Sequence, residues 1–179
     1  MKVRLLVPLA LSATALVACG HTGTPGSTPG ATNADGGNAS GDFCTIAQKV
    51  VNDQQGVADA IRAITLNTVS GPDMATPAGW AQRQTLATDA VNVAQSLIAD
   101  YAAGDPLITD PAVVTSWDQM SQFYSDSVLA ANQAVLAAPD EATYTTTNTG
   151  GSLTVAPTAA QIAVQTYITG QCGFLSPAR

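Results

Sequence analysis

The sequence has little of the chemistry on which most catalytic sites depend. Its one histidine, His21, lies in a polar stretch rich in glycine and proline with no other ligand residues around it. Segment 42–179 therefore has no histidine, which excludes Ser-His-Asp and Cys-His catalysis and histidine-based zinc sites there. No phosphate-binding loop, dinucleotide fingerprint or EF-hand loop is present either. We expect no cofactor, no metal and no enzymatic activity.

Basic residues are also scarce. The chain has six lysines and arginines against thirteen acidic residues. Two of the six, Lys2 and Arg4, lie within the first 18 residues, and the rest of the chain has four basic residues and all thirteen acids, a net charge of −9. A surface of this sign repels phosphate backbones, and no cluster of lysine or arginine offsets it. We therefore do not expect nucleic acid as a partner.

Carboxylate pairs are the catalytic groups that remain. Asp105 with Asp110, and Asp118 with Asp126, are candidates for glycoside hydrolysis, which uses two such groups. These acids fall at expected helix starts and on polar helix faces, where helix capping and solvation account for them. Asp105 and Asp110 also suit a calcium loop, but two carboxylates are too few ligands to predict one.

The N-terminal residues have the features of an export signal. Lys2 and Arg4 are followed by an apolar run of about fourteen residues, Leu5 to Ala18. That run is shorter than the roughly 20 apolar residues that span a bilayer as a stable helix. A basic start and a short apolar core are typical of a cleaved signal peptide.

The run ends in Leu16-Val17-Ala18-Cys19-Gly20, which resembles the lipobox of bacterial lipoproteins. In that family a diacylglycerol is joined to the cysteine sulfur, the signal peptide is cut just before the cysteine, and the new amine is often acylated. The resemblance implies a signal peptide at 1–18, a lipid on Cys19 and an anchor on the extracytoplasmic face of the cell membrane. An ordinary secretory signal, cut after Ala13-Thr14-Ala15, is the alternative.

Residues 19–41 are expected to form a disordered tether. After Cys19 the segment consists mainly of glycine, serine, threonine, proline, asparagine and alanine, without an aromatic or large aliphatic residue. Such a segment cannot bury enough apolar area to offset the entropy lost on ordering. A flexible chain of this length spans roughly 25 Å, which would hold the folded domain at 42–179 clear of the membrane.

Apolar residues after position 42 recur at helical spacing in four segments. Start and stop signals bound each of them. Trp80, Tyr101, Trp117 and Tyr124 lie on the apolar stripes, so we expect them in the core rather than in a ligand-stacking box. The four expected helices run from Asp42 as N-cap to about Val69, from Thr76-Pro77 to Gly104, from Asp110-Pro111 to Pro139, and from a capping box at Thr158 and Gln161 to Gly170.

The two remaining cysteines predict the topology. With Cys19 lipidated, Cys44 and Cys172 are an even pair in an oxidising compartment, where a disulfide is expected. Cys44 lies in the first turn of the first expected helix, and Cys172 lies just past the fourth. These points share one end of an all-α, antiparallel up-down-up-down four-helix bundle, which the disulfide would close. Their Cα atoms should lie within about 7 Å.

The connection 139–156 is the longest in the expected domain. Segments 142–147 and 152–155 flank a turn-like sequence and favour a short hairpin. Loops held on a rigid scaffold commonly carry recognition, and Tyr144 is the aromatic residue of this one. We therefore expect Tyr144 to contact a partner.

Together these features predict a membrane-anchored, extracytoplasmic lipoprotein. Its domain is expected to act as a non-catalytic protein-binding or envelope structural module, with an envelope or extracellular protein as partner. One alternative is a lipoprotein that holds an apolar or sugar-like small ligand between its helices. A carboxylate-dependent hydrolase is the least favoured alternative.

Overall fold

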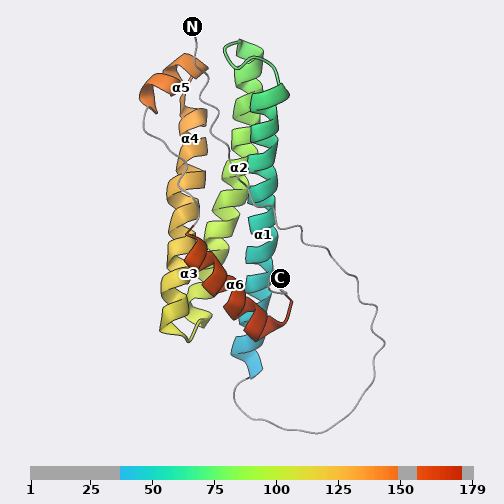
Figure 1. Ribbon diagram of the computed structural model, residues 1–179, viewed down its shortest axis with the longest axis vertical. Coiled ribbons are helices and arrows are strands. Elements are labelled where there is room, and N and C mark those ends of the chain that lie inside the picture. The colour runs from blue at the N-terminus through green and yellow to red at the C-terminus, as the bar shows by residue number, and fades with distance from the viewer. Residues whose placement is uncertain (1–36, 149–156, 175–179) are drawn as a thin grey trace, which may run out of the picture. The chain divides into compact units, whose positions relative to one another are not determined.

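A computed structural model describes residues 37–148 and 157–174, all of which belong to one compact unit. Every regular element in these ranges is helical, which confirms the all-α class (Figure 1). Because α3, η2 and α4 follow one another without a break, the described residues form five helices. The elements are α1 (Gly37–Ser70), α2 (Pro77–Gly104), the short 3-10 turn η1 (Asp105–Leu107), α3 (Pro111–Phe123), the π-helical η2 (Tyr124–Leu129), α4 (Ala130–Ala137), α5 (Glu141–Thr147) and α6 (Thr158–Cys172).

Two helix starts are confirmed in atomic detail. The Thr76 hydroxyl accepts a hydrogen bond from Gly79 N at 3.1 Å, and Pro77 is the first residue of α2. The Asp110 carboxylate accepts from Ala112 N at 2.9 Å, and Pro111 opens α3. A polar cap followed by proline satisfies a free amide and supplies a helical φ angle in advance.

Three other helix ends are corrected by the structure. Helix α1 begins at Gly37, so Asp42 lies inside the helix instead of capping it. The N-cap of α6 is Pro157 rather than Thr158, and no side chain caps this end. Helix α6 also passes Gly170 and ends at Cys172; its C-cap is Gly173, whose φ of 70° lies in the left-handed region that glycine adopts without strain.

The hairpin prediction for 142–147 is wrong, because these residues belong to α5. The Asp140 carboxylate accepts a hydrogen bond from Thr143 N at 2.7 Å and so caps the helix. The hydroxyls of three threonines in this helix donate to carbonyl oxygens earlier in the same helix, as Thr145 does to Glu141 O at 2.8 Å. Segment 152–155 lies outside the described residues.

The main core lies around Trp117, which is 1 % exposed. The Trp117 indole N–H donates to Tyr101 O at 2.7 Å, and the two rings meet edge to face with centroids 4.7 Å apart. Tyr124 stacks on Tyr101, with ring centroids 6.0 Å apart. All four aromatic residues expected in the core are buried, so mutual packing accounts for them.

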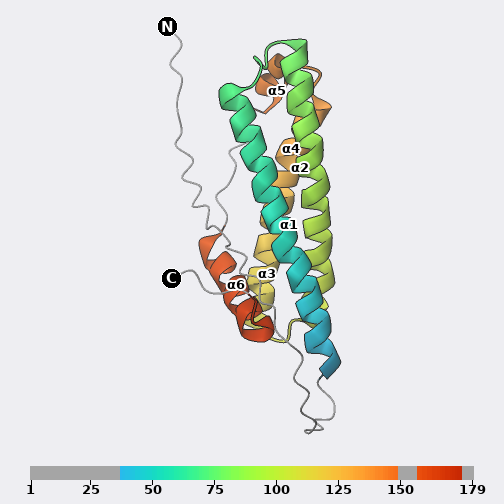
Figure 2. The same cartoon turned by 90° about the vertical axis from the view of Figure 1, so that its right-hand side faces the viewer.

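The predicted disulfide is confirmed, and it places α6. Cys44 and Cys172 are bonded, with their Cα atoms 5.4 Å apart. Because α1 starts early, Cys44 lies about two turns inside that helix. Helix α6 packs mainly on α3 and less on α1, beside the half of α1 that contains Cys44 (Figure 2). Ile162, expected on the buried stripe of α6, is instead 58 % exposed.

The expected signal peptide at 1–18, Cys19 and most of the tether lie outside the described residues; the last part of 19–41 opens α1. Within the described ranges, no helix combines the length and the hydrophobicity needed to cross a bilayer.

Candidate functional site

The end of the domain farthest from the disulfide gathers the features that internal packing explains least. We call this region, residues 66–87 and 132–148, the distal end. Figures 1 and 2 both place the end of α1, the start of α2 and all of α5 there, with the start of α1 at the opposite end. The region therefore combines residues of α1 and α2 with residues of α4 and α5, including Tyr144, which was predicted to contact a partner.

A small apolar cluster separate from the main core lies at the distal end. Its buried members are Trp80, Ala87, Val135 and Ala138, and Tyr144 packs against them. The Trp80 indole N–H and the Gln84 amide both donate to Ala138 O at 3.0 Å. These bonds fix the corner between α4 and α5. Helix α1 contributes no member to this cluster.

Tyr144 is half-buried rather than free on a loop. Its ring lies against the Trp80 ring, with centroids 5.8 Å apart. The prediction that Tyr144 contacts a partner remains open, because one side of its ring already packs on the domain. Its neighbours Thr145, Thr146 and Thr147 are exposed and form the outer surface of α5.

Arg83 is an unusual residue beside this cluster, because it is largely buried without an acidic partner. Arg83 Nη2 donates to Asn132 Oδ1 at 3.4 Å, and Nη1 has no hydrogen-bond partner. Burial lowers the pKa of the guanidinium, and Tyr144 offsets part of that shift. No carboxylate of the described residues contributes to the pKa. An arginine keeps its charge at neutral pH even so, so this positive charge is uncompensated.

Asn67 adds a second unsatisfied polar group. It is 7 % exposed, and neither its amide nitrogen nor its amide oxygen has a hydrogen-bond partner. A Cβ on Gly56 of α1 would lie 2.9 Å from Val93 of α2. Asn67 lies eleven residues after Gly56 on α1, and Arg83 lies ten residues before Val93 on α2. Because the two helices run in opposite directions, Asn67 and Arg83 lie at about the same height along the helix pair.

Arg83 and Asn132 are hydrogen-bonded, and Asn67 lies at the level of Arg83; we call these three residues the polar layer. Each occupies a position where the apolar stripe of its helix would continue, three residues after Ile64, three after Trp80 and four after Val128. Asn132 is 5 % exposed and donates to Val128 O at 2.8 Å. Sequence reasoning missed this layer, although a polar residue on an apolar stripe was the available signal.

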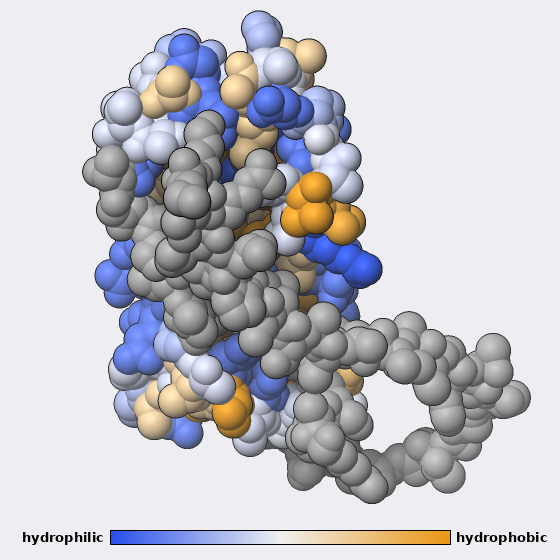
Figure 3. Space-filling model, turned by 45° about the horizontal axis from the view of Figure 1, so that its top comes forward, coloured by the Kyte–Doolittle hydropathy of each residue, from blue (hydrophilic) through white to orange (hydrophobic). Residues whose placement is uncertain are grey.

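The end of α1 also exposes apolar side chains. Leu66 is 56 % exposed and Val69 is 81 % exposed, one helical turn apart. On the face shown in Figure 3 the described residues are mostly hydrophilic, with only small, separate hydrophobic groups. Leu66 and Val69 form one small apolar group of this kind at the end of α1.

The acids of the two candidate carboxylate pairs occupy helix caps, turns or exposed positions. Asp110 caps α3, and Asp118 and Asp126 are exposed. Asp105 has one buried oxygen without a partner, but it lies in η1 rather than in a cleft with a second acid. The described residues contain no group of three or more metal-ligating side chains.

A different pair of acids was missed because it joins two helices. Burial is the main cause that raises the pKa of Asp100, Asp53 of α1 raises it further, and Lys49 opposes them. One oxygen of Asp53 is buried without a partner. A sequence separation of 47 residues hides such a pair until the register of α1 on α2 is known.

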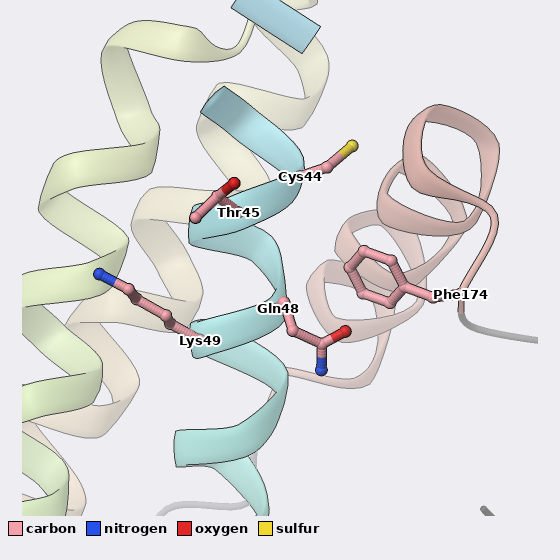
Figure 4. Close-up of a pocket in the computed structure, with 5 residues that line it drawn as sticks. All are labelled: Cys44, Thr45, Gln48, Lys49 and Phe174. Atoms are coloured by element: carbon pink, nitrogen blue, oxygen red, sulfur yellow. The ribbon is translucent and has the colours of Figure 1, made fainter. Parts of the chain in front are cut away.

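A shallow hollow of about 540 Å³ lies beside the disulfide. Cys44, Thr45, Gln48, Lys49 and Phe174 line it. Figure 4 shows the Phe174 ring facing Gln48, while Lys49 points away toward the other side of α1. The hollow is therefore a surface feature between α1 and the end of α6, rather than a cavity between the long helices.

No protein-family model matches the chain, and comparisons with curated proteins and with solved structures find no match.

Proposed function

We propose that this protein is a membrane-anchored, extracytoplasmic lipoprotein whose helical domain is a non-catalytic binding module for an envelope or extracellular protein. Its lipid would be carried by Cys19 and its partner would dock at the distal end, with Tyr144 and α5 in the contact. The observation that carries the proposal is the position of the Trp80–Tyr144 cluster and the exposed Leu66 and Val69 at the end farthest from the tether.

The length of α1 supports this arrangement. Any tether from Cys19 joins the domain at the start of α1, and α1 has 34 residues. A helix of that length is about 50 Å long. An anchored domain would therefore present α5 and the start of α2 well away from the bilayer, where a partner can reach them.

We further propose that the helices form an antiparallel up-down-up-down bundle. In this arrangement α1, α2 and the continuous α3–η2–α4 helix are the first three members, and α6 is the fourth. The contact of early α1 with late α2, as between Ile46 and Gly104, supports it for the first pair. Because α6 has 15 residues, the fourth position would be filled over only part of the bundle.

Site-specific photo-cross-linking tests the distal surface in living cells. A photoreactive phenylalanine replaces exposed Thr145 of α5, and the matched control carries it at exposed Thr166 of α6. We expect one discrete adduct of the full-length protein from position 145 and none from 166. Equal adducts from both positions, or an adduct from 166 alone, would contradict the proposal.

The mass of the protein extracted from membranes tests the anchor. We expect a chain that begins at Cys19 and carries the mass of its acyl chains. Two or more chains are needed because a single acyl chain binds membranes only weakly. A chain that begins after Ala15 with an unmodified Cys19 would show ordinary secretion instead.

A further inference from the structure

Arg83 brings a positive charge into the distal end without a negative one to balance it. Burying an ion costs free energy unless a group of opposite charge or several hydrogen bonds compensate it. Among the described residues, the Arg83 side chain makes one hydrogen bond, a long one of 3.4 Å to the uncharged amide of Asn132. We propose that Arg83 is the centre of a carboxylate-binding site, with Asn67 and Asn132 of the polar layer beside it.

The unsatisfied atoms define the chemical class of the ligand. Arg83 Nη1 and Asn67 Nδ2 are donors without acceptors. A carboxylate offers two acceptor oxygens in one plane, and a guanidinium binds such a group through parallel hydrogen bonds. A cation is excluded by the charge of Arg83. A single arginine also suits a carboxylate with one negative charge better than a phosphate with nearly two.

Movement of helix α5 would allow a carboxylate ligand to reach Arg83. Tyr144 packs on Trp80, which lies one turn before Arg83 on α2. Apart from this ring contact, α5 makes only sparse contacts with the other helices. Tyr144 also lies close enough to Arg83 to influence its pKa. Because α5 has only seven residues, a small displacement of it would change the surroundings of Arg83 at low cost.

The carboxylate has two possible sources, an acidic side chain of a protein partner or a small free carboxylate. The site does not depend on the proposed partner function, because either source can be tested on the isolated protein. If photo-cross-linking fails while carboxylate binding is measured, the proposed partner surface is wrong and this site stands. If photo-cross-linking succeeds while no carboxylate binding is measured, the proposed partner surface stands and the carboxylate site is wrong.

The test measures the melting temperature of the full-length protein in a non-ionic detergent. The concentration of sodium acetate is increased while sodium fluoride is reduced, so that the ionic strength stays constant. Fluoride is a suitable replacement because it is strongly hydrated and enters a buried site poorly. Wild type and the exposed-arginine control Arg62→Met should both rise by about 3 °C at ten times the dissociation constant. Arg83→Met should show no rise. A rise of wild-type size in Arg83→Met, or no rise in wild type, would overturn the proposal.

A second variant covers the case in which Arg83→Met does not fold. Asn132→Asp places a carboxylate at the position that already contacts Arg83, so the acetate response should be lost because the site supplies its own anion. An unchanged acetate response in a folded Asn132→Asp protein would also contradict the site.

To distinguish the two possible sources of the carboxylate, N-acetyl-glutamate amide is compared with N-acetyl-glutamine amide. A rise with the glutamate compound alone indicates an acidic side chain, and a rise only with acetate indicates a small free anion.

Discussion

Gly104 and Trp117 show how closely the main core is packed. A Cβ at position 104 would lie 2.5 Å from Cζ2 of the buried Trp117 ring. We expect Gly104→Ala to lower the free energy of unfolding by about 1–3 kcal/mol, because the ring has no room to move. Gly170→Ala is the matched control, since a Cβ there meets nothing within 4 Å. It should raise the free energy of unfolding by about 0.4–1 kcal/mol. Urea unfolding measures both, and equal effects would contradict this account.

Asp100 should weaken the protein at neutral pH. Its pKa is raised above the ordinary value of 3.8, so folding disfavours the ionised form. This cost is present above the raised pKa and disappears as the pH falls below 3.8. Asp100→Asn should therefore raise the melting temperature at pH 7 but not at pH 3. Exposed Asp89→Asn on the same helix removes an equal charge, and a gain of the same size in both variants would indicate general charge repulsion.

At the residue scale, the sequence was sufficient for the large aromatic residues but not for the buried polar ones. Trp117 and Tyr101 could be placed in the core because large rings on an apolar stripe have no better environment. Arg83 and Asn67 looked like ordinary breaks in their stripes. Their importance depends on the register of α1 against α2, which aligns them, and no pattern within one helix contains that register.

At the element scale, helix starts were predictable where two signals agreed. Thr76-Pro77 and Asp110-Pro111 each combine a capping side chain with a proline. Asp42 had no neighbouring proline as a second signal, and α1 begins before it, at Gly37. The π-helical segment η2 could not be predicted, because periodicity assumes a regular turn and η2 changes the turn within a continuous helix.

Helix α5 should be the most acid-sensitive element. Hydrogen bonds from Thr143 hold the pKa of Asp140 below its ordinary value of 3.8. The capping contribution is therefore present above pH 3.8 and is lost as the pH falls through the lowered pKa. We expect the amide resonances of α5 to lose their structured shifts at low pH before those of α2. Asp140→Asn keeps a capping oxygen and should remove this acid dependence, whereas an unchanged acid dependence in that variant would assign it elsewhere.

At the scale of the whole molecule, cysteine counting predicted the main long-range constraint. The disulfide joins residues 128 positions apart, and a loop of this length restricts the unfolded chain strongly. The double variant Cys44→Ala, Cys172→Ala should lose about 4–5 kcal/mol of unfolding free energy while keeping its helical content. A loss below about 1 kcal/mol in urea unfolding would show that the unfolded chain is already compact. The partial coverage by α6 was not predictable, because it depends on which helix α6 packs against.

The position of the disulfide also determines how the domain would carry a mechanical load. A pull between the tether and a partner on α5 enters at Gly37 and meets Cys44 about two turns later. From there the covalent chain divides into a long arm through α2 and α4, and a short arm from Cys172 back to Thr147. The short arm has about 25 residues and cannot extend beyond roughly 85 Å. Once it is taut it bears the tension, so the three long helices are protected from being unravelled end to end.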